Sequence, residues 1–225
     1  MDDYRSSLKV VGIILITVGL LDIGWMIWCI AHQQGYSSSF NIFAVIAGIL
    51  LMRGGLRTAN VVAFFSAFLL SGLIGALLTF PFLVPLDLML AYLRAYPVYF
   101  IVSLFFVVCT LVLLGWIYSR LTAPLVKAAI VEKYPRYASF WRRPRNGFLV
   151  GALLVIVLVL GLGFMLHGAS AQRACAEAKL KVGDGYKFWV SSLSMQSSGG
   201  RSHYSAVVTA YNQTEIREIP TEWDE

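Results

Sequence analysis

Residues 58–80 have the sequence TANVVAFFSAFLLSGLIGALLTF, in which no side chain is charged. An α-helix rises about 1.5 Å per residue, so about 20 apolar residues cross the roughly 30 Å hydrocarbon core of a bilayer. Three further segments have comparable length and hydropathy, and they are residues 10–31, 98–118 and 148–166. These four stretches predict an integral membrane protein with the lipid bilayer as its main partner.

The composition of the chain agrees with this class. Hydrophobic residues make up 58% of the 225 residues and charged residues only 13%, whereas a soluble domain carries about 25% charged residues. The net charge of +6 is a feature of nucleic-acid-binding proteins too, but its distribution along the chain follows membrane orientation. We therefore expect no nucleic-acid partner.

Residues 36–52 form a shorter apolar stretch, and the positions of Lys and Arg favour a crossing here as well. Cytoplasmic loops of membrane proteins collect basic residues. Three basic groups lie between the apolar stretches or before the first of them. They are Arg5 and Lys9, then Arg53 and Arg57, and finally Arg120, Lys127, Lys133, Arg136, Arg142, Arg143 and Arg145 in the loop 120–147. All three groups lie on one side of the membrane only if residues 36–52 cross it. The sequence predicts a membrane all-α bundle of five transmembrane helices within residues 1–167, with the N-terminus inside and the C-terminus outside.

Two connecting segments carry patterns of their own. Residues 85–96 place Leu86, Met89, Leu90 and Leu93 at i, i+3, i+4 and i+7, which predicts a helix lying flat in the membrane interface, although Leu88 interrupts the pattern. In the basic cytoplasmic loop 120–147, aromatic residues alternate with arginines. Such a segment could bind RNA or a particular anionic lipid, but the positive-inside rule with an aromatic belt accounts for it more simply.

A stripe of small residues recurs at every fourth position of the segment 58–80. Its members are Ala59, Ala63, Ala67, Ser71 and Gly75. Apolar side chains gain little from leaving lipid, so helices in a membrane associate where small residues let their backbones approach closely. We expect the stripe to face other helices of the same chain, and a homo-oligomer is the alternative use of such a face.

Asp22 is the one ionisable residue deep within a predicted span. A carboxylate at that depth costs roughly 2.5–3.5 kcal/mol on insertion scales, and such residues often transfer protons or bind cations. Ser71 lies at a similar depth in the segment 58–80 and is the expected hydrogen-bond partner. A structural hydrogen bond is favoured, because a proton relay would include further acidic residues or histidines.

After residue 167 the composition becomes polar, and residues 168–225 predict a small extracytoplasmic α+β domain. The pattern predicts a helix over 169–182, strands over 186–195 and 203–211, and a weaker strand over 214–219 that ends before Pro220 and an acidic terminus. Period-two alternation puts Tyr186, Phe188 and Val190 on one face of the first strand and Trp189, Leu193 and Met195 on the other. So short a segment buries little surface alone, so we expect it to lean on the membrane or on a protein partner that adds a strand to its sheet.

No catalytic or cofactor-binding motif is present, and we expect neither enzymatic activity nor a cofactor. Soft ligands that would suit copper map to the outer half of the chain without motif spacing, and they are His32, His167, His203, Met26, Met165, Met195, Cys29 and Cys175. Whether Cys29 and Cys175 pair is left open by the sequence. Ala169, Ser170 and Ala171 imitate a signal-peptide cleavage site, but the apolar run before them is longer than such peptides have.

The function expected from these features is that of a non-enzymatic protein of the bacterial cytoplasmic (inner) membrane. Its outward C-terminal domain would bind or help to assemble another component of the envelope. The first alternative is a subunit of a small transport or ion-coupled system that uses Asp22. The second is metal handling on the outer face.

Overall fold

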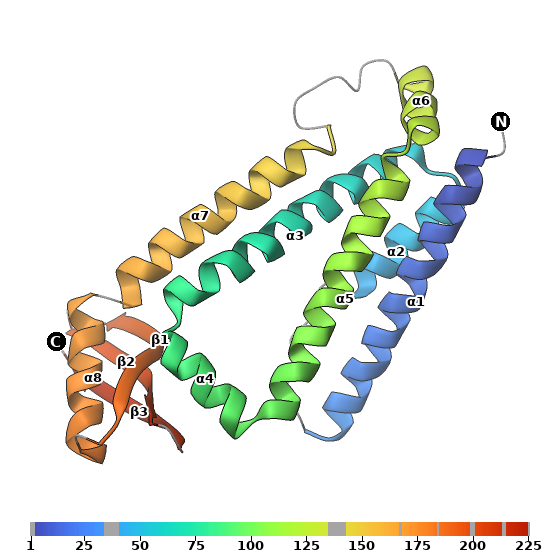
Figure 1. Cartoon of the computed structure of the whole chain (residues 1–225). Helices are drawn as coiled ribbons and strands as arrows, with labels where there is room; N and C mark the ends of the chain where they lie inside the picture. The colour runs from blue at the N-terminus through green and yellow to red at the C-terminus, as the bar shows by residue number, and fades with distance from the viewer. Residues whose placement is uncertain are drawn as a thin grey trace. The chain divides into compact units, whose positions relative to one another are not determined.

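A computed structural model describes residues 3–33, 41–134, 143–166, 168–183, 185–198, 201–212 and 215–224. Its helices are α1 (Asp3–Ala31), α2 (Asn41–Met52), α3 (Leu56–Leu83), α4 (Leu86–Ala95), α5 (Pro97–Leu121), α6 (Pro124–Lys133), α7 (Asn146–Leu166) and α8 (Ala169–Val182), and its strands are β1 (Lys187–Ser198), β2 (Arg201–Tyr211) and β3 (Ile216–Asp224) (Figure 1). Within the described residues, α1, α3, α5 and α7 are the four helices long and apolar enough to cross a membrane. The membrane class predicted from the sequence is confirmed.

Two compact units make up the chain. The first comprises Met1–Ile74 and Cys109–Leu153, and the second comprises Gly75–Val108 and Leu154–Glu225. Both units therefore contain parts of the apolar helices α3, α5 and α7, whereas the sheet belongs wholly to the second unit.

The helix α2 is shorter than the predicted span 36–52. It has 12 residues, which corresponds to roughly 18 Å of helix, while residues 36–40 lie outside the described part of the chain. It packs directly along α1 at two glycines: a Cβ atom at Gly12 would lie 2.7 Å from the carbonyl oxygen of Gly48, and one at Gly48 would lie 2.6 Å from that of Gly12. The two backbones touch, and neither glycine leaves room for a side chain. A fifth crossing remains a prediction.

The buried core of the first unit brings together residues that adjoin the basic segments in sequence. Its members from α1, α2 and α3 are Leu8, Val11, Leu51, Leu56, Ala59 and Ala63, and those from α5 and α6 are Ile117, Leu121, Val126 and Ile130. Close by, the guanidinium of Arg57 stacks over the ring of Tyr134 at 4.8 Å. The N-terminal segment, the α2–α3 connection and the α5–α6 connection thus meet at one end of this unit.

The sheet of the second unit is antiparallel, in the order β1-β2-β3. A small antiparallel sheet was predicted, but its third strand was predicted wrongly. The strand β3 runs through Pro220 to Asp224 and pairs with β2 from Ile216 onward, so that Trp223 lies buried opposite Tyr204 instead of in a free acidic end. Proline is tolerated there because β3 is an edge strand and its outer side needs no ladder hydrogen bond.

The strand β1 contains a bulge that the period-two prediction missed. Val190 lies opposite Val208 and Ser192 opposite Val207, so one extra residue is inserted at Ser191. A bulge reverses the alternation beyond it. Leu193 therefore packs in the same cluster as Phe188 and Val190, not on the face of Trp189 as predicted.

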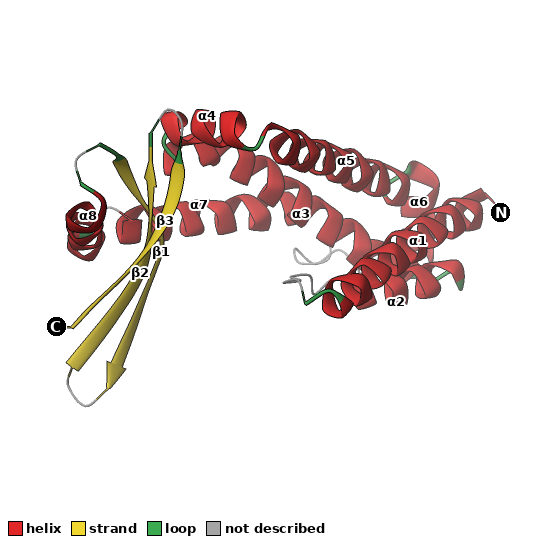
Figure 2. Cartoon of the chain, turned by 90° about the horizontal axis from the view of Figure 1, so that it is seen from below, coloured by secondary structure: helices red, strands yellow, loops and turns green. Residues whose placement is uncertain are grey.

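One helix covers each face of this sheet (Figures 1 and 2). The helix α8 has the predicted bounds and packs Ala171, Ala174 and Ala178 against a cluster that includes Val208 and Trp223. The helix α4 contacts the other face through Leu88 and Ala91, which pack with Tyr211 and Trp189. The sheet of the C-terminal segment is thus packed on one face by α8 of the same segment and on the other by α4 from the middle of the chain.

Candidate functional site

The helix α4 is apolar on two sides, which explains the irregularity of its sequence pattern. Leu88 is fully buried against the sheet, with Ala91 one turn further along. The predicted apolar stripe is on a different side, where Leu86 is 62% and Leu90 50% exposed. Leu88 therefore belongs to a second face, and the helix presents one apolar side to protein and another outward.

A third side of α4 carries its two charges. Asp87 forms an ion pair with Lys187 at the start of β1, and this hydrogen bond raises the pKa of the Lys187 ammonium above its ordinary value. Both side chains are more than half exposed, so the pair adds little to stability. Arg94 lies two turns further along the same side and makes no hydrogen bond or ion pair with any residue that the structure describes.

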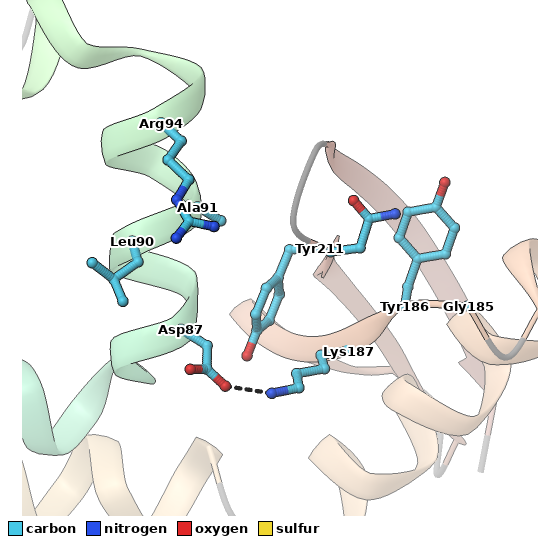
Figure 3. A pocket seen from close by; sticks show the side chains of 9 residues that line it. Asp87, Leu90, Ala91, Arg94, Gly185, Tyr186, Lys187 and Tyr211 are labelled. Carbon is cyan, nitrogen blue, oxygen red and sulfur yellow. Dashed lines mark hydrogen bonds and ion pairs between the residues drawn. The ribbon is translucent and has the colours of Figure 1, made fainter.

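These charged groups line a cavity of about 440 Å³ between α4 and the neighbouring ends of β1 and β2. The ring of Tyr211 forms its inner wall, and its hydroxyl points to the space between Asp87 and Lys187 (Figure 3). Tyr211 is only 5% exposed, and burial raises the pKa of its phenol. Within the described residues this hydroxyl has no hydrogen-bond partner.

At the rim of the cavity, Tyr186 takes part in a hydrogen-bond network around Glu215. The Tyr186 hydroxyl donates to Glu215 at 2.8 Å, and the Arg217 guanidinium donates to the other carboxylate oxygen at 2.6 Å. These two hydrogen bonds, the one from Arg217 first, lower the pKa of Glu215 below its ordinary value. The backbone N–H of Glu215 also donates to the side-chain oxygen of Asn212 at 2.8 Å. Glu215 thereby connects Asn212, at the end of β2, with Tyr186, at the start of β1.

A second cavity of about 550 Å³ lies on the opposite flank of α4, and its lining is almost wholly apolar. Aromatic side chains dominate the lining, namely Phe80, Tyr92, Tyr96, Tyr99, Phe100 and Trp189. The indole N–H of Trp189 donates to the carbonyl of Leu83 at 3.3 Å, which fixes β1 to the end of α3. An aromatic lining of this kind suits hydrocarbon chains better than polar solutes.

The sheet has two outer strands of unlike character. On β3, Pro220 and the charged residues Arg217, Glu218 and Glu222 protect the edge, as in many soluble sheets. On β1, the stretch beyond the bulge carries Ser192, Ser194 and Gln196, which are exposed and uncharged. The outer side of β1 is therefore the edge without protecting charges or proline.

The small-residue stripe of α3 lies at helix contacts in both units. Ala59, Ala63 and Ala67 are completely buried. A Cβ atom at Gly151 of α7 would collide with the Ser71 hydroxyl and the Phe68 carbonyl, and one at Gly147 would collide with the Phe64 carbonyl. In the second unit, a Cβ atom at Gly75 would lie 3.0 Å from Val155. The stripe is thus used within this chain.

The glycines of α7 were missed in the sequence, although a signal was present. Gly147 and Gly151 form a G-x-x-x-G pattern, which brings two membrane helices into backbone contact. Gly147 lies just before the predicted span 148–166, next to the basic loop, so the pattern was not interpreted as a packing motif.

Asp22 is half-buried in α1. The expected partner, Ser71, donates its hydroxyl to the carbonyl of Phe68 in its own helix at 3.1 Å. A hydroxyl can still accept a second hydrogen bond, so the pairing of Asp22 with Ser71 stays a prediction.

The soft ligands are dispersed. Cys29, Cys109 and Cys175 are free thiols, and a ring nitrogen of His32 lies 2.8 Å from the Trp28 carbonyl. Among the residues described, no group of three or more His, Cys, Asp or Glu side chains comes together. His167 lies outside that part of the chain.

Comparison with known proteins gives no relative from which a function can be transferred. No family model, no curated protein and no solved structure matches this chain.

Proposed function

We propose that the protein is a membrane-anchored docking protein whose sheet accepts a strand from another component of the bacterial envelope. In this proposal the chain crosses the cytoplasmic membrane five times, and the second unit's sheet lies on the outer side. The protein catalyses no reaction, and it acts by holding its partner at the membrane surface.

The observation that carries the proposal is the difference between the two edges of the sheet. An unpaired edge exposes a row of N–H and C=O groups that can bind a strand of another chain, and proteins usually block such edges with charges, proline or bulges. The edge of β3 is blocked by Pro220 and by charged residues that include Arg217, Glu218 and Glu222. Beyond its bulge, β1 offers seven residues, Ser192–Ser198, without a charge or a proline. An edge of that length is long enough for a complete strand pairing.

The orientation is supported by the core of the first unit. The side chains of Leu8, Leu56 and Val126 share one buried cluster, and each is close in sequence to one of the three basic groups. Lys and Arg next to apolar helices favour the cytoplasmic side. The three basic groups therefore adjoin one end of the unit, and the proposal places that end on the cytoplasmic side. That placement requires residues 36–52 to cross the membrane, which gives five crossings.

Cysteine labelling tests the orientation with two exposed helix positions, Val131 in α6 and Leu180 in α8. In a background in which the three native cysteines are replaced by alanine, a membrane-impermeant maleimide should label Leu180→Cys in intact cells. It should label Val131→Cys only after the cells are permeabilised. Labelling of Val131→Cys in intact cells would contradict the five-span topology.

Photo-crosslinking tests the docking edge. A photoreactive amino acid at Gln196 on β1 should form an adduct with another envelope protein in native membranes, whereas one at Glu222 on β3 should not. Ser192→Lys and Ser194→Lys place charges along the free edge and should abolish the adduct. A chain in which both edges crosslink equally, or in which the lysines leave the adduct unchanged, would refute docking through β1.

A further inference from the structure

The cavity between α4 and the sheet is lined by polar groups that can bind a ligand. Tyr211 is a buried residue, and its hydroxyl points into this space without a hydrogen-bond partner among the described residues (Figure 3). A hydroxyl that faces the cavity can donate a hydrogen bond to a group bound there. Arg94, also without a partner there, lines the same cavity.

The charges of the cavity define the class of ligand. Arg94 and Lys187 contribute two positive charges and Asp87 one negative charge, which leaves a net charge of +1. Because Asp87 already engages Lys187, Arg94 is the cation available to a ligand. A guanidinium with its planar fork of N–H donors binds phosphate oxygens bidentately. A phosphodiester carries one negative charge and would match both the charge and the donors.

The surroundings of the cavity indicate the source of this phosphodiester. Leu90 lines the cavity and also belongs to the exposed apolar stripe of α4 with Leu86 and Leu93. A helix with such a stripe beside charged residues lies in the interface between headgroups and acyl chains. A phosphate bound next to Leu90 would therefore have its hydrocarbon chains along the stripe.

From these observations we propose that the cavity binds the phosphodiester headgroup of a phospholipid. Arg94 and the hydroxyl of Tyr211 contact the phosphate, while the ion pair between Asp87 and Lys187 joins α4 to β1 beside it. The bound lipid would fix α4 and the sheet against the membrane surface.

Lipid titration tests the proposal on the full-length protein in detergent, monitored by native mass spectrometry. The probes are dihexanoyl phosphatidylglycerol, dihexanoyl glycerol, which lacks the phosphate and its headgroup, and glycerophosphoglycerol, the same phosphodiester without the acyl chains. The phospholipid should bind at least tenfold more tightly than either of the others. Tyr211→Phe keeps the buried ring and removes only the hydroxyl, and it should weaken phospholipid binding at least about tenfold, the loss expected for a hydrogen bond to a charged group.

Arg94→Gln should weaken binding by a similar factor, while Arg173→Gln on α8 removes an equal charge away from the cavity and should bind as the unmodified protein does. Thermal unfolding of each variant without lipid checks that the fold is retained. Equal binding of the phospholipid by Tyr211→Phe, Arg94→Gln and Arg173→Gln would overturn the site. Binding of glycerophosphoglycerol as tight as that of the phospholipid would overturn the assignment to a lipid.

Discussion

The contact between α3 and α7 in the first unit and the contact between α4 and the sheet in the second are built in opposite ways. In the first, Cβ atoms at Gly147 and Gly151 would collide with backbone carbonyls of α3, so the two backbones lie in direct contact. In the second, Leu88, Trp189 and Tyr211 interdigitate, and cavities remain on both flanks of the helix. The first contact leaves no space between the two helices, whereas the second is flanked by cavities with room for ligands.

Each arrangement follows from the medium in which its elements are expected to associate. Between helices in lipid, apolar side chains gain nothing by leaving the solvent, so close backbone approach supplies the attraction. Elements that meet water can gain from burying large side chains, at roughly 25 cal/mol per Å². Large side chains of unlike shape leave gaps, and gaps lined with charges are where a binding site can form.

The largest effect is expected at the glycine contact. Gly151→Leu would drive a side chain into the carbonyl of Phe68, which is a backbone group. The free energy of unfolding should therefore fall by at least about 3 kcal/mol, the upper end of typical overpacking. Abundance in membranes and the melting temperature in detergent measure the loss. Gly161→Leu in the same helix is the control, because nothing lies within 4 Å of a Cβ atom there. Equal tolerance of both leucines would contradict the tight contact.

The next effect concerns the two apolar sides of α4. Leu88→Ala should destabilise the second unit by about 2–5 kcal/mol, since it leaves a hole in a fully buried position. Leu86→Ala, on the exposed side of the same helix, should change stability by less than about 0.5 kcal/mol. Hydrogen exchange of the β1–β3 amides in the full-length protein reports both changes. If the two alanines had the same effect, α4 would not be packed on the sheet.

A smaller effect is expected at Asp22, which distinguishes a structural carboxyl from an ion-coupled one. An amide keeps the ability to hydrogen-bond, so Asp22→Asn should leave abundance and docking unchanged, and Asp22→Leu should cost only roughly 0.6 kcal/mol, the average for such bonds within membranes. Both variants are measured for membrane abundance and for the crosslink at Gln196. An Asp22→Asn protein that is as abundant in membranes as the unmodified protein but has lost its function would favour the transport alternative.

The smallest effect is a pH dependence at the rim of the cavity. Folding lowers the pKa of Glu215 through its hydrogen bonds to Arg217 and Tyr186, so its contribution is complete above the ordinary carboxyl pKa. The contribution is lost as the pH falls through the lowered value. Glu215→Gln should remove a slight part of the acid-induced loss of stability, measured as melting temperature between pH 6 and about pH 3, a span that covers ordinary carboxyl pKa values. Glu222→Gln on β3 removes the same charge without breaking either of these hydrogen bonds and is the matched control.

Features of the fold that depend on a single segment could be predicted from the sequence of that segment. The hydropathy of residues 58–80 and of the three comparable stretches predicted four helices of membrane-spanning length, and the bounds of α8 were predicted to the residue. The stripe from Ala59 to Gly75 was visible because helical periodicity is a property of a single segment. The bulge at Ser191 was not, since the sequence contains no signal for an extra residue until the partner strand fixes the register.

By itself, then, the sequence determined the medium of this protein, because mean hydropathy over about 20 residues decides whether a helix is more stable in lipid or in water. The sequence also determined the helical periodicity of the small-residue stripe from Ala59 to Gly75. Only the tertiary structure decided that Leu88, which interrupts the pattern of its own helix, is buried beneath a sheet formed from the last part of the chain. The same packing directs Arg94 and Tyr211 into one cavity. Contacts between segments that are distant in sequence depend on how their surfaces fit, and no single segment carries that information.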